Sequence, residues 1–289
     1  MEGNIAKYQA LCEVARLGSL TAAARELGYS QSGMSRIMQD LEREWGVTLL
    51  SRGRHGITLT PDGDRILPMV QRVVDDQRRV NELVGEVRGL ETGSVRVGTF
   101  SSVATYRLPR VLGHLQAAHP KVEYELLMGD WGEIERWTNT GRVDVGFIPF
   151  APAAPLQSRV VEKDELMAVV PREHPLAARA EVRLGELTAD PYLMLERGDN
   201  GVIPRMFADA GLEPRVWLTT WDDYAIMSMV EAGLGVSVLP RLILQRCPFD
   251  VTILPLAGHP YREINVIWRD EATLSRAARD FLESLDTWG

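Results

Sequence analysis

The apolar residues of this chain change their spacing near residue 90, and this change fixes the broad architecture. Before it, apolar side chains recur every three or four residues, which is typical of helices. From Ser94 onward, short apolar runs typical of strands alternate with helical segments, which favours a parallel sheet with crossover helices. The 289 residues exceed the usual size of one domain, about 100 to 200 residues, so we expect a helical head and a larger α/β body.

Composition excludes several classes of protein. Hydrophobic residues make up 45% and charged residues 25% of the chain, which excludes collagen-like, disordered and disulfide-scaffold proteins. No apolar run approaches the roughly 20 residues that span a bilayer, and the N-terminus has no signal peptide pattern. We therefore expect a cytoplasmic protein with no membrane contact. Cys12, Cys247 and the five histidines fall at no metal spacing, so neither a metal nor a cofactor is predicted.

The net charge of −8 is unevenly distributed. Residues 1–90 carry 12 basic and 12 acidic side chains, whereas the remaining residues carry 20 and 28. The overall field of such a chain does not attract nucleic acid. Any contact with DNA must therefore come from a few side chains on a local surface.

The head contains three short helices separated by turn signals. Apolar residues at Tyr8, Leu11, Cys12 and Ala15 predict the first helix, which Gly18 ends. Ser19 is placed to cap a second helix over residues 20–27, and Ser30 a third over 31–45. The third helix has an apolar sector, formed by Met34, Ile37, Met38, Leu41 and Trp45, and an opposite polar sector, formed by Ser32, Arg36, Gln39 and Arg43. This pattern is typical of a helix-turn-helix that enters a major groove, although the polar sector alone fits a solvated surface equally well.

Two further elements follow the third helix. Residues 47–50 and 56–59 predict a hairpin wing with Arg52 and Arg54 near its tip, suited to a minor groove or to phosphates. A helix then begins at Thr60 and Pro61, and we expect Pro68 to kink it. Its apolar seam alternates spacings of four and three: Ile66, Val70, Val73, Gln77, Val80, Val84 and Val87. Such a seam favours pairing with a second copy over packing within its own domain.

In the body, polar and aromatic residues follow the predicted strands. Ligands of open α/β sheets bind at the carboxyl ends of the strands, so we expect a ligand cleft there, although Ser101 and its neighbours fit an ordinary helix cap equally well. The candidate cleft residues are Ser101, Ser102, Thr105, Asp130, Trp131, Pro149, Phe150 and Trp221. The serine hydroxyls suit a carboxylate or another polar group, and the indoles suit a flat or apolar one.

Over nearly its whole length the chain resembles the LysR-type transcriptional regulators. The head carries the residues Gly18–Leu27, Ser30, Gln31, Ser35, Leu41, Glu42, Gly46, Leu49, Arg52 and Leu59–Gly63 of the family signature. The body carries Leu108, Pro109, His119, Pro120, Gly141–Asp144, His174–Ala177, Ala232–Val236, Leu239 and Pro240. The chain departs from the family at Ser32, Gly33 and Met34, where a proline and two apolar residues are common, and at Leu50, where phenylalanine is common.

The resemblance implies a transcription factor that binds double-stranded DNA and responds to a small-molecule effector of unknown identity. It implies a winged helix-turn-helix over residues 1–60, a dimerisation helix over 61–90 and a two-lobed, periplasmic-binding-protein-like α/β effector domain over 91–289. Lobe I would comprise 92–164 and 266–289, and lobe II 165–265. A homodimer or homotetramer is expected, with RNA polymerase as a further partner. The expected DNA contacts are Ser19, Thr21, Gln31, Ser32, Ser35, Arg36, Gln39, Arg43, Arg52 and Arg54.

Two other classes remain as alternatives. An enzyme that uses the two-lobed body would need an acid, base or nucleophile clustered in the cleft, and the sequence contains no GxSxG, P-loop or HExxH motif. A solute-binding transport component is disfavoured because no signal peptide is visible.

Overall fold

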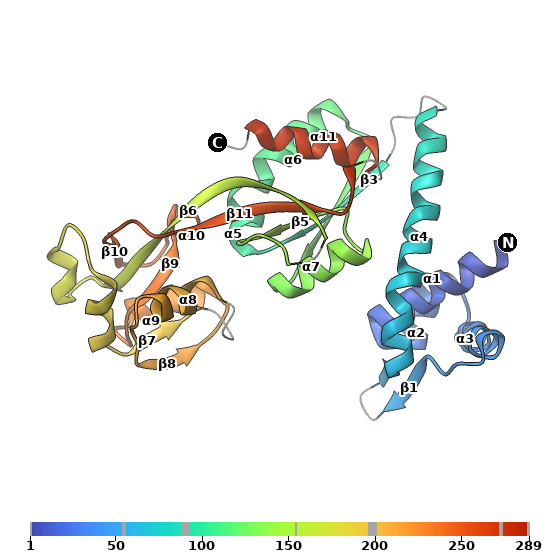
Figure 1. The fold of residues 1–289 in the computed structure, drawn as a ribbon, viewed down its shortest axis with the longest axis horizontal. Helices are drawn as coiled ribbons and strands as arrows, with labels where there is room; N and C mark the ends of the chain where they lie inside the picture. The colour runs from blue at the N-terminus through green and yellow to red at the C-terminus, as the bar shows by residue number, and fades with distance from the viewer. Residues whose placement is uncertain are drawn as a thin grey trace.

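The computed structural model describes residues 2–53, 56–87, 93–153, 155–195, 201–271 and 274–287. A helical head and a long helix stand at one side of the molecule, lobe I lies in the middle, and lobe II lies at the far side (Figure 1). The combination of an N-terminal helix-turn-helix domain with a two-lobed α/β body agrees with the predicted fold class.

The head contains α1 (Glu2–Leu17), α2 (Leu20–Glu26), α3 (Gln31–Trp45), β1 (Leu50–Gly53) and β2 (Gly56–Leu59). Both predicted caps are confirmed: the Ser19 hydroxyl accepts a hydrogen bond from the amide of Ala22, and Ser30 accepts one from Gly33. The apolar sector of α3 packs through Met34, Met38 and Leu41 against α1 and α2. This packing leaves the polar sector of α3 facing outward.

The first strand of the wing begins later in the structure than the sequence predicts. β1 pairs antiparallel with β2 from Leu50, not from Val47, because the Glu42 carboxylate accepts the backbone amides of Leu49 at 2.7 Å and Leu50 at 3.1 Å. An acidic side chain of α3 thus holds the segment that precedes the strand. The expected tip residues Arg54 and His55 lie outside the described residues.

The helix α4 (Pro61–Val87) continues through Pro68. The apolar seam of α4 is buried near its N-terminal end and exposed farther along the helix. Ile66 and Val70 pack into the core of the head, and Val70 is only 5% exposed, which leaves little of its side chain for the expected dimer interface. Val73, Val80 and Val84 are exposed, as are their neighbours Met69 and Leu83. Gln77 is half-buried, and the side chain of Val87 is not described.

Lobe I is built on three parallel strands. β3 (Gly93–Thr99) lies between β4 (Val122–Met128) and β5 (Val145–Ile148). The helices are α5 (Ser101–Tyr106), α6 (Leu108–Ala118), α7 (Trp131–Thr140) and α11 (Arg276–Ser284), followed by a 3-10 turn at Leu285–Thr287. The sequence predicted a single helix that begins at Arg107. The structure has that helix as α6 and adds a separate short helix, α5, before it.

Two long strands connect the lobes. β6 (Gln157–Pro171) and β11 (Tyr261–Trp268) pair antiparallel, and β6 also pairs antiparallel with β9 (Ser237–Pro240) and β10 (Val251–Pro255). Lobe II adds β7 (Tyr192–Met194), β8 (Val216–Thr219), α8 (Val202–Asp209), α9 (Asp223–Glu231), α10 (Arg241–Leu244) and 3-10 turns at Pro175–Ala178 and Leu184–Ala189. The expectation of parallel pairing is therefore correct for β3, β4 and β5 of lobe I and for β7 with β8, whereas β11 pairs antiparallel with β5.

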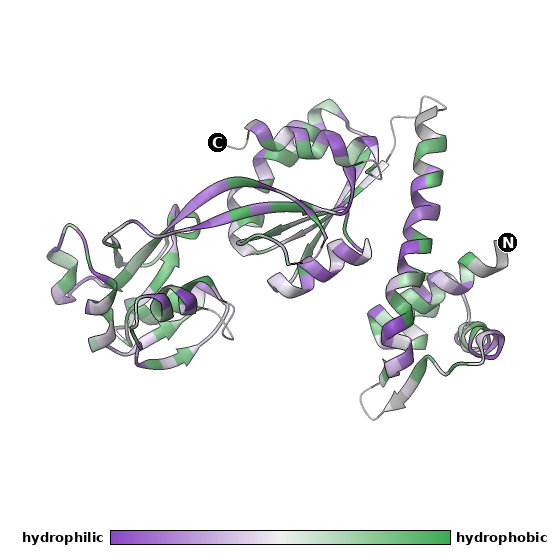
Figure 2. Cartoon of the chain, in the orientation of Figure 1, coloured by the Kyte–Doolittle hydropathy of each residue, from purple (hydrophilic) through white to green (hydrophobic). Residues whose placement is uncertain are grey.

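Each lobe has its own hydrophobic cluster. Phe147 and Phe281 are fully buried in lobe I, and Tyr192 and Phe207 in lobe II. Hydrophilic residues gather where β6 passes between the lobes (Figure 2), at Glu162–Glu165. Within the described ranges, no helix is both long enough and apolar enough to cross a membrane.

The exposed part of the α4 seam generates a prediction about oligomeric state. The seam is expected to pair two copies, and Val80→Asp would then place an unpaired charge in an apolar interface at a cost of at least about 3 kcal/mol, so we expect this variant to be a monomer. Light scattering across a concentration series measures the mass. Asn81→Asp is the matched control because it adds the same charge at the next exposed position, beside the seam. An unchanged mass for Val80→Asp would show that this seam is not the dimer contact.

Candidate functional site

The outward sector of α3 is an exposed polar surface. Ser32, Arg36, Gln39 and Arg43 are all exposed, and the Arg36 side chain is 85% exposed. Arg43 donates a hydrogen bond to Asp40 at 2.7 Å, whereas Arg36 lies 3.9 Å from the same carboxylate. Arg36 is therefore held less tightly than Arg43 and is free to extend toward a ligand.

The other expected DNA contacts differ in how exposed their side chains are. Thr21 and Gln31 are exposed in the first turns of α2 and α3, whereas Ser35 is half-buried on α3. Ser19 is half-buried, and its hydroxyl serves as the cap of α2. Arg52 lies on β1, but its side chain, like all of Arg54, lies outside the described residues.

In the body, Ser101 joins the two lobes. Its hydroxyl donates a hydrogen bond to the Oδ2 atom of Asp223, at 2.7 Å, from the first residue of α5 to the first residue of α9. Asp223 is only 7% exposed, and this burial raises the pKa of its carboxyl group, against the opposing effects of Ser101 and of Arg262. The sequence analysis did not single out Asp223, although it lies only two residues beyond Trp221.

Ser102 belongs to a buried ionic network. Arg262, on β11, donates from Nε to Asp164 at 2.9 Å and from Nη2 to the Ser102 hydroxyl at 2.8 Å. Its guanidinium also lies over the Phe100 ring, 5.2 Å from the centroid. Asp164, on β6, accepts the amide of Leu242 at 2.8 Å. The side chains of Ser102, Arg262 and Asp164 are at most 5% exposed. The Ser102 hydroxyl already accepts a hydrogen bond from Arg262, so a protein partner occupies it.

The remaining expected cleft residues have separate roles. Asp130 caps α7 in a reciprocal pair with Glu133. Trp131 packs edge-to-face on Phe150, with ring centroids 5.8 Å apart, and Pro149 is buried. Thr105 and Trp221 are exposed, and Trp221 lies two residues before Asp223. The structure thus joins Ser101 to Asp223 and Ser102 to Arg262, while Asp130 acts as a helix cap.

Comparison with known proteins identifies the family. Residues 88–289 match the family model described as the LysR substrate binding domain, and residues 5–64 match that of the bacterial regulatory helix-turn-helix protein, lysR family. The chain is a LysR-type transcriptional regulator. This membership makes it a DNA-binding regulator with an effector-binding domain, and it gives the enzyme alternative no support.

Individual relatives agree with this assignment. The chain is 32% identical over 250 residues to the probable transcriptional regulator LrrA of Synechococcus elongatus, covering 86% of this chain and 84% of that protein. It is 27% identical over 283 residues to the transcriptional regulator YvbU of Bacillus subtilis, covering 97% of each. It is similar to full-length CbnR complexed with its target DNA, with a TM-score of 0.70, 26% identity and 99% coverage of both chains.

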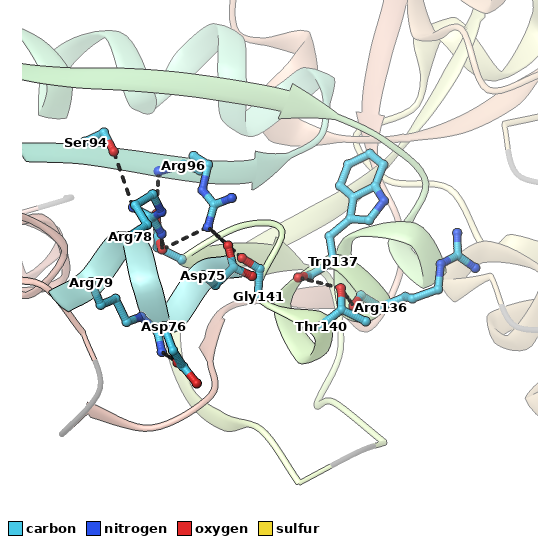
Figure 3. A network of polar contacts seen from close by, with 11 residues as sticks. Asp75, Asp76, Arg78, Arg79, Ser94, Arg96, Arg136, Trp137, Thr140 and Gly141 are labelled. Carbon is cyan, nitrogen blue, oxygen red and sulfur yellow. Dashed lines mark hydrogen bonds and ion pairs between the residues drawn. The ribbon is translucent and has the colours of Figure 1, made fainter. Parts of the chain in front are cut away.

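In this LysR-type regulator, a buried ionic clamp joins α4 to lobe I (Figure 3). We use the name clamp for Asp75 and Arg78 of α4 together with Arg96 of β3 and Asp144, just before β5. Arg96 donates to Asp75 at 2.9 Å, and Arg78 donates to Asp144 at 2.6 Å. The amide of Arg96 also donates to Asp144, at 2.8 Å. Both carboxylates are buried, at 1% and 6% exposure, whereas the side chains of Arg78 and Arg96 reach partly into solvent, at 25% and 16% exposure.

The environment of the clamp leaves little room for change. Gly141 has φ of 83°, and a Cβ atom there would lie 2.6 Å from Oδ2 of Asp75 and 2.5 Å from Nη2 of Arg269. Burial raises the pKa of Asp75 despite the nearby arginines. For Asp144 burial acts in the same direction, but Arg96 and Arg78 outweigh it and lower the pKa of that carboxyl.

Breaking the clamp should separate the head from the body in thermal unfolding. Arg96→Met leaves two buried carboxylates without this partner, and removal of one member of a buried ion pair costs about 3 to 5 kcal/mol. We expect calorimetry to show head and body unfolding together in the native chain and in two steps in the variant. Arg79→Met is the control, because Arg79 pairs at 3.3 Å with the exposed Asp76 on the same helix. A single unchanged transition in Arg96→Met would contradict this role.

Proposed function

We propose that this regulator reads operator DNA through the outward sector of α3. The observation that carries the proposal is the exposed polar sector of a capped helix in the second position of a helix-turn-helix. Arg36 and Gln39 suit bidentate contacts with guanine and adenine edges, respectively. Thr21, Ser35 and Arg52 suit phosphates. The similar CbnR has been solved with its target DNA, which supports the same use of the head here.

The same proposal places the effector between the lobes, beside Ser101. Support comes from the two strands that connect this place with the clamp. Arg96 lies on β3, which leads into Ser101, and Asp144 directly precedes β5, which leads into Pro149. A change in lobe angle caused by a ligand at the carboxyl ends therefore acts on strands whose amino ends hold α4. This arrangement gives the effector a direct physical route to the DNA-binding head.

The domain limits and the assembly belong to the same proposal. We assign residues 1–60 to DNA binding, 61–90 to the linker helix and 91–289 to the effector domain, with lobe I formed by 92–164 and 266–289. Val73, Val80 and Val84 of two copies pair in a homodimer, because their exposed side chains lie along one face of α4; the assembly is this homodimer or a homotetramer built of two such dimers. RNA polymerase is proposed as a further partner of the DNA-bound assembly.

Substitution of Arg36 tests the DNA-reading surface. Arg36→Ala should cost about 1 to 3 kcal/mol of binding at one base position and should relax sequence preference there. Binding to operator variants changed one base pair at a time, at fixed salt, measures this. Arg172→Ala is the control, because it removes another exposed arginine, which lies in lobe II and pairs with the exposed Asp250. An equal loss on every DNA sequence would show that Arg36 contacts phosphate alone.

A further inference from the structure

The polar groups that meet between the lobes carry unequal charge. Two carboxylates, of Asp164 and Asp223, lie within the same hydrogen-bonded region as one guanidinium, of Arg262. Arg262 is committed to Asp164, because its Nε and Nη2 atoms lie 2.9 Å and 2.8 Å from Oδ2 of that carboxylate. Among these three groups, Asp223 is therefore the one without a partner of opposite charge.

Asp223 is buried without a cation bound to it. Its side-chain partner is the neutral hydroxyl of Ser101, and among the residues that the structure describes no lysine, arginine or histidine forms an ion pair with it. A buried carboxylate without a cationic partner is costly, and burial is the main reason that the pKa of Asp223 is raised. A cation brought to this carboxylate would remove much of that cost.

We propose that the effector of this regulator is an organic cation, such as an amine or a guanidine, whose charged nitrogen pairs with Asp223. This assignment rests on the proposed function, since it takes the effector to lie between the lobes beside Ser101. It also revises the sequence-based expectation of a carboxylate, because the hydroxyl that was to receive the carboxylate already donates to Asp223.

An anionic effector would meet unfavourable contacts at the same place. A ligand carboxylate placed beside that of Asp223 would be repelled by it, and burial strengthens this repulsion because the surroundings screen it poorly. Neither nearby serine offsets this, because Ser101 donates to Asp223 and Ser102 is 2% exposed and holds Arg262. A cation gains Coulomb attraction from the same arrangement.

Aromatic rings beside Asp223 suit the rest of such a ligand. Tyr224 follows Asp223 and is 41% exposed, and its ring packs edge-to-face on Phe249, with centroids 6.2 Å apart. The Phe100 ring of the same region already carries the Arg262 guanidinium on its face. Rings that accept a protein cation in this way also stabilise the cation of a ligand, which favours an aromatic or alkyl amine.

The test uses the full-length chain with charge-matched probes. Benzylammonium is compared with benzoate, and 1,5-diaminopentane with glutarate, at equal ionic strength, by thermal shift and by titration calorimetry. We expect at least one of the two amines to raise the unfolding temperature, and both carboxylates to leave it unchanged. Asp223→Asn should weaken amine binding at least about tenfold, which is about 1.4 kcal/mol, while keeping an acceptor for Ser101. Asp223→Ala is a second variant that removes the charge if the amide variant does not fold.

Asp222→Asn is the matched control. Asp222 is exposed and caps α9 through the amides of Tyr224 and Ala225, and asparagine caps a helix equally well, so amine binding should persist. The proposal is overturned if neither amine binds, if carboxylates bind in preference, or if amine binding survives in Asp223→Asn and Asp223→Ala.

A variant that blocks the proposed effector site distinguishes a wrong cation assignment from a wrong location of the site. Thr105 lies one turn after Ser101 on α5 and is exposed, so Thr105→Trp places an indole on the same face of the helix. We expect it to abolish amine binding. If carboxylates bind to the native chain and Thr105→Trp abolishes their binding, the effector site between the lobes stands and the cation assignment is wrong. If Thr105→Trp leaves probe binding intact, the site itself lies elsewhere.

Discussion

The buried clamp between α4 and lobe I is the interaction on which the arrangement of this regulator depends. Its four charges come from two parts of the chain that otherwise have separate cores, because α4 packs on α1 through the head cluster and Arg96 lies in the sheet of lobe I. Buried ion pairs contribute little net stability but tolerate only one geometry. The clamp therefore fixes where the head lies relative to the body at small energetic gain.

The clamp and the interlobe site lie at opposite ends of the same strands. From Arg96, β3 continues for four residues of strand, or about 13 Å, to Thr99, shortly before Ser101. A sheet of close-packed strands transmits a displacement of one end to the other with little loss. The position of α4 and the angle between the lobes are thus mechanically related, without any contact between the DNA-binding head and the ligand.

Features set by local interactions could be predicted from the sequence, whereas those set by long-range contacts could not. The caps Ser19 and Ser30 and the bounds of α3 follow from residues within one turn, and they are confirmed. The start of β1 depends on Glu42, and the burial of Val70 depends on α1. Asp223 lies 122 residues from Ser101, and Arg262 lies 160 residues from Ser102, so no spacing within a window of sequence reveals either partnership.

The crossing strands place the proposed effector site beside the connection between the lobes. β6 and β11 are the long strands that pass between the lobes, and their polar middle contains Asp164 and Arg262. Successive strand residues face opposite sides, so these two point toward Ser102 while Glu165 points to the other face, where it meets His259 and Arg241. Arg262 cannot serve both Asp164 and Asp223 without weakening the connection of the two strands. The pair that joins β6 to β11 is therefore also the reason that Asp223 has no cationic side chain bound to it and can take an external one.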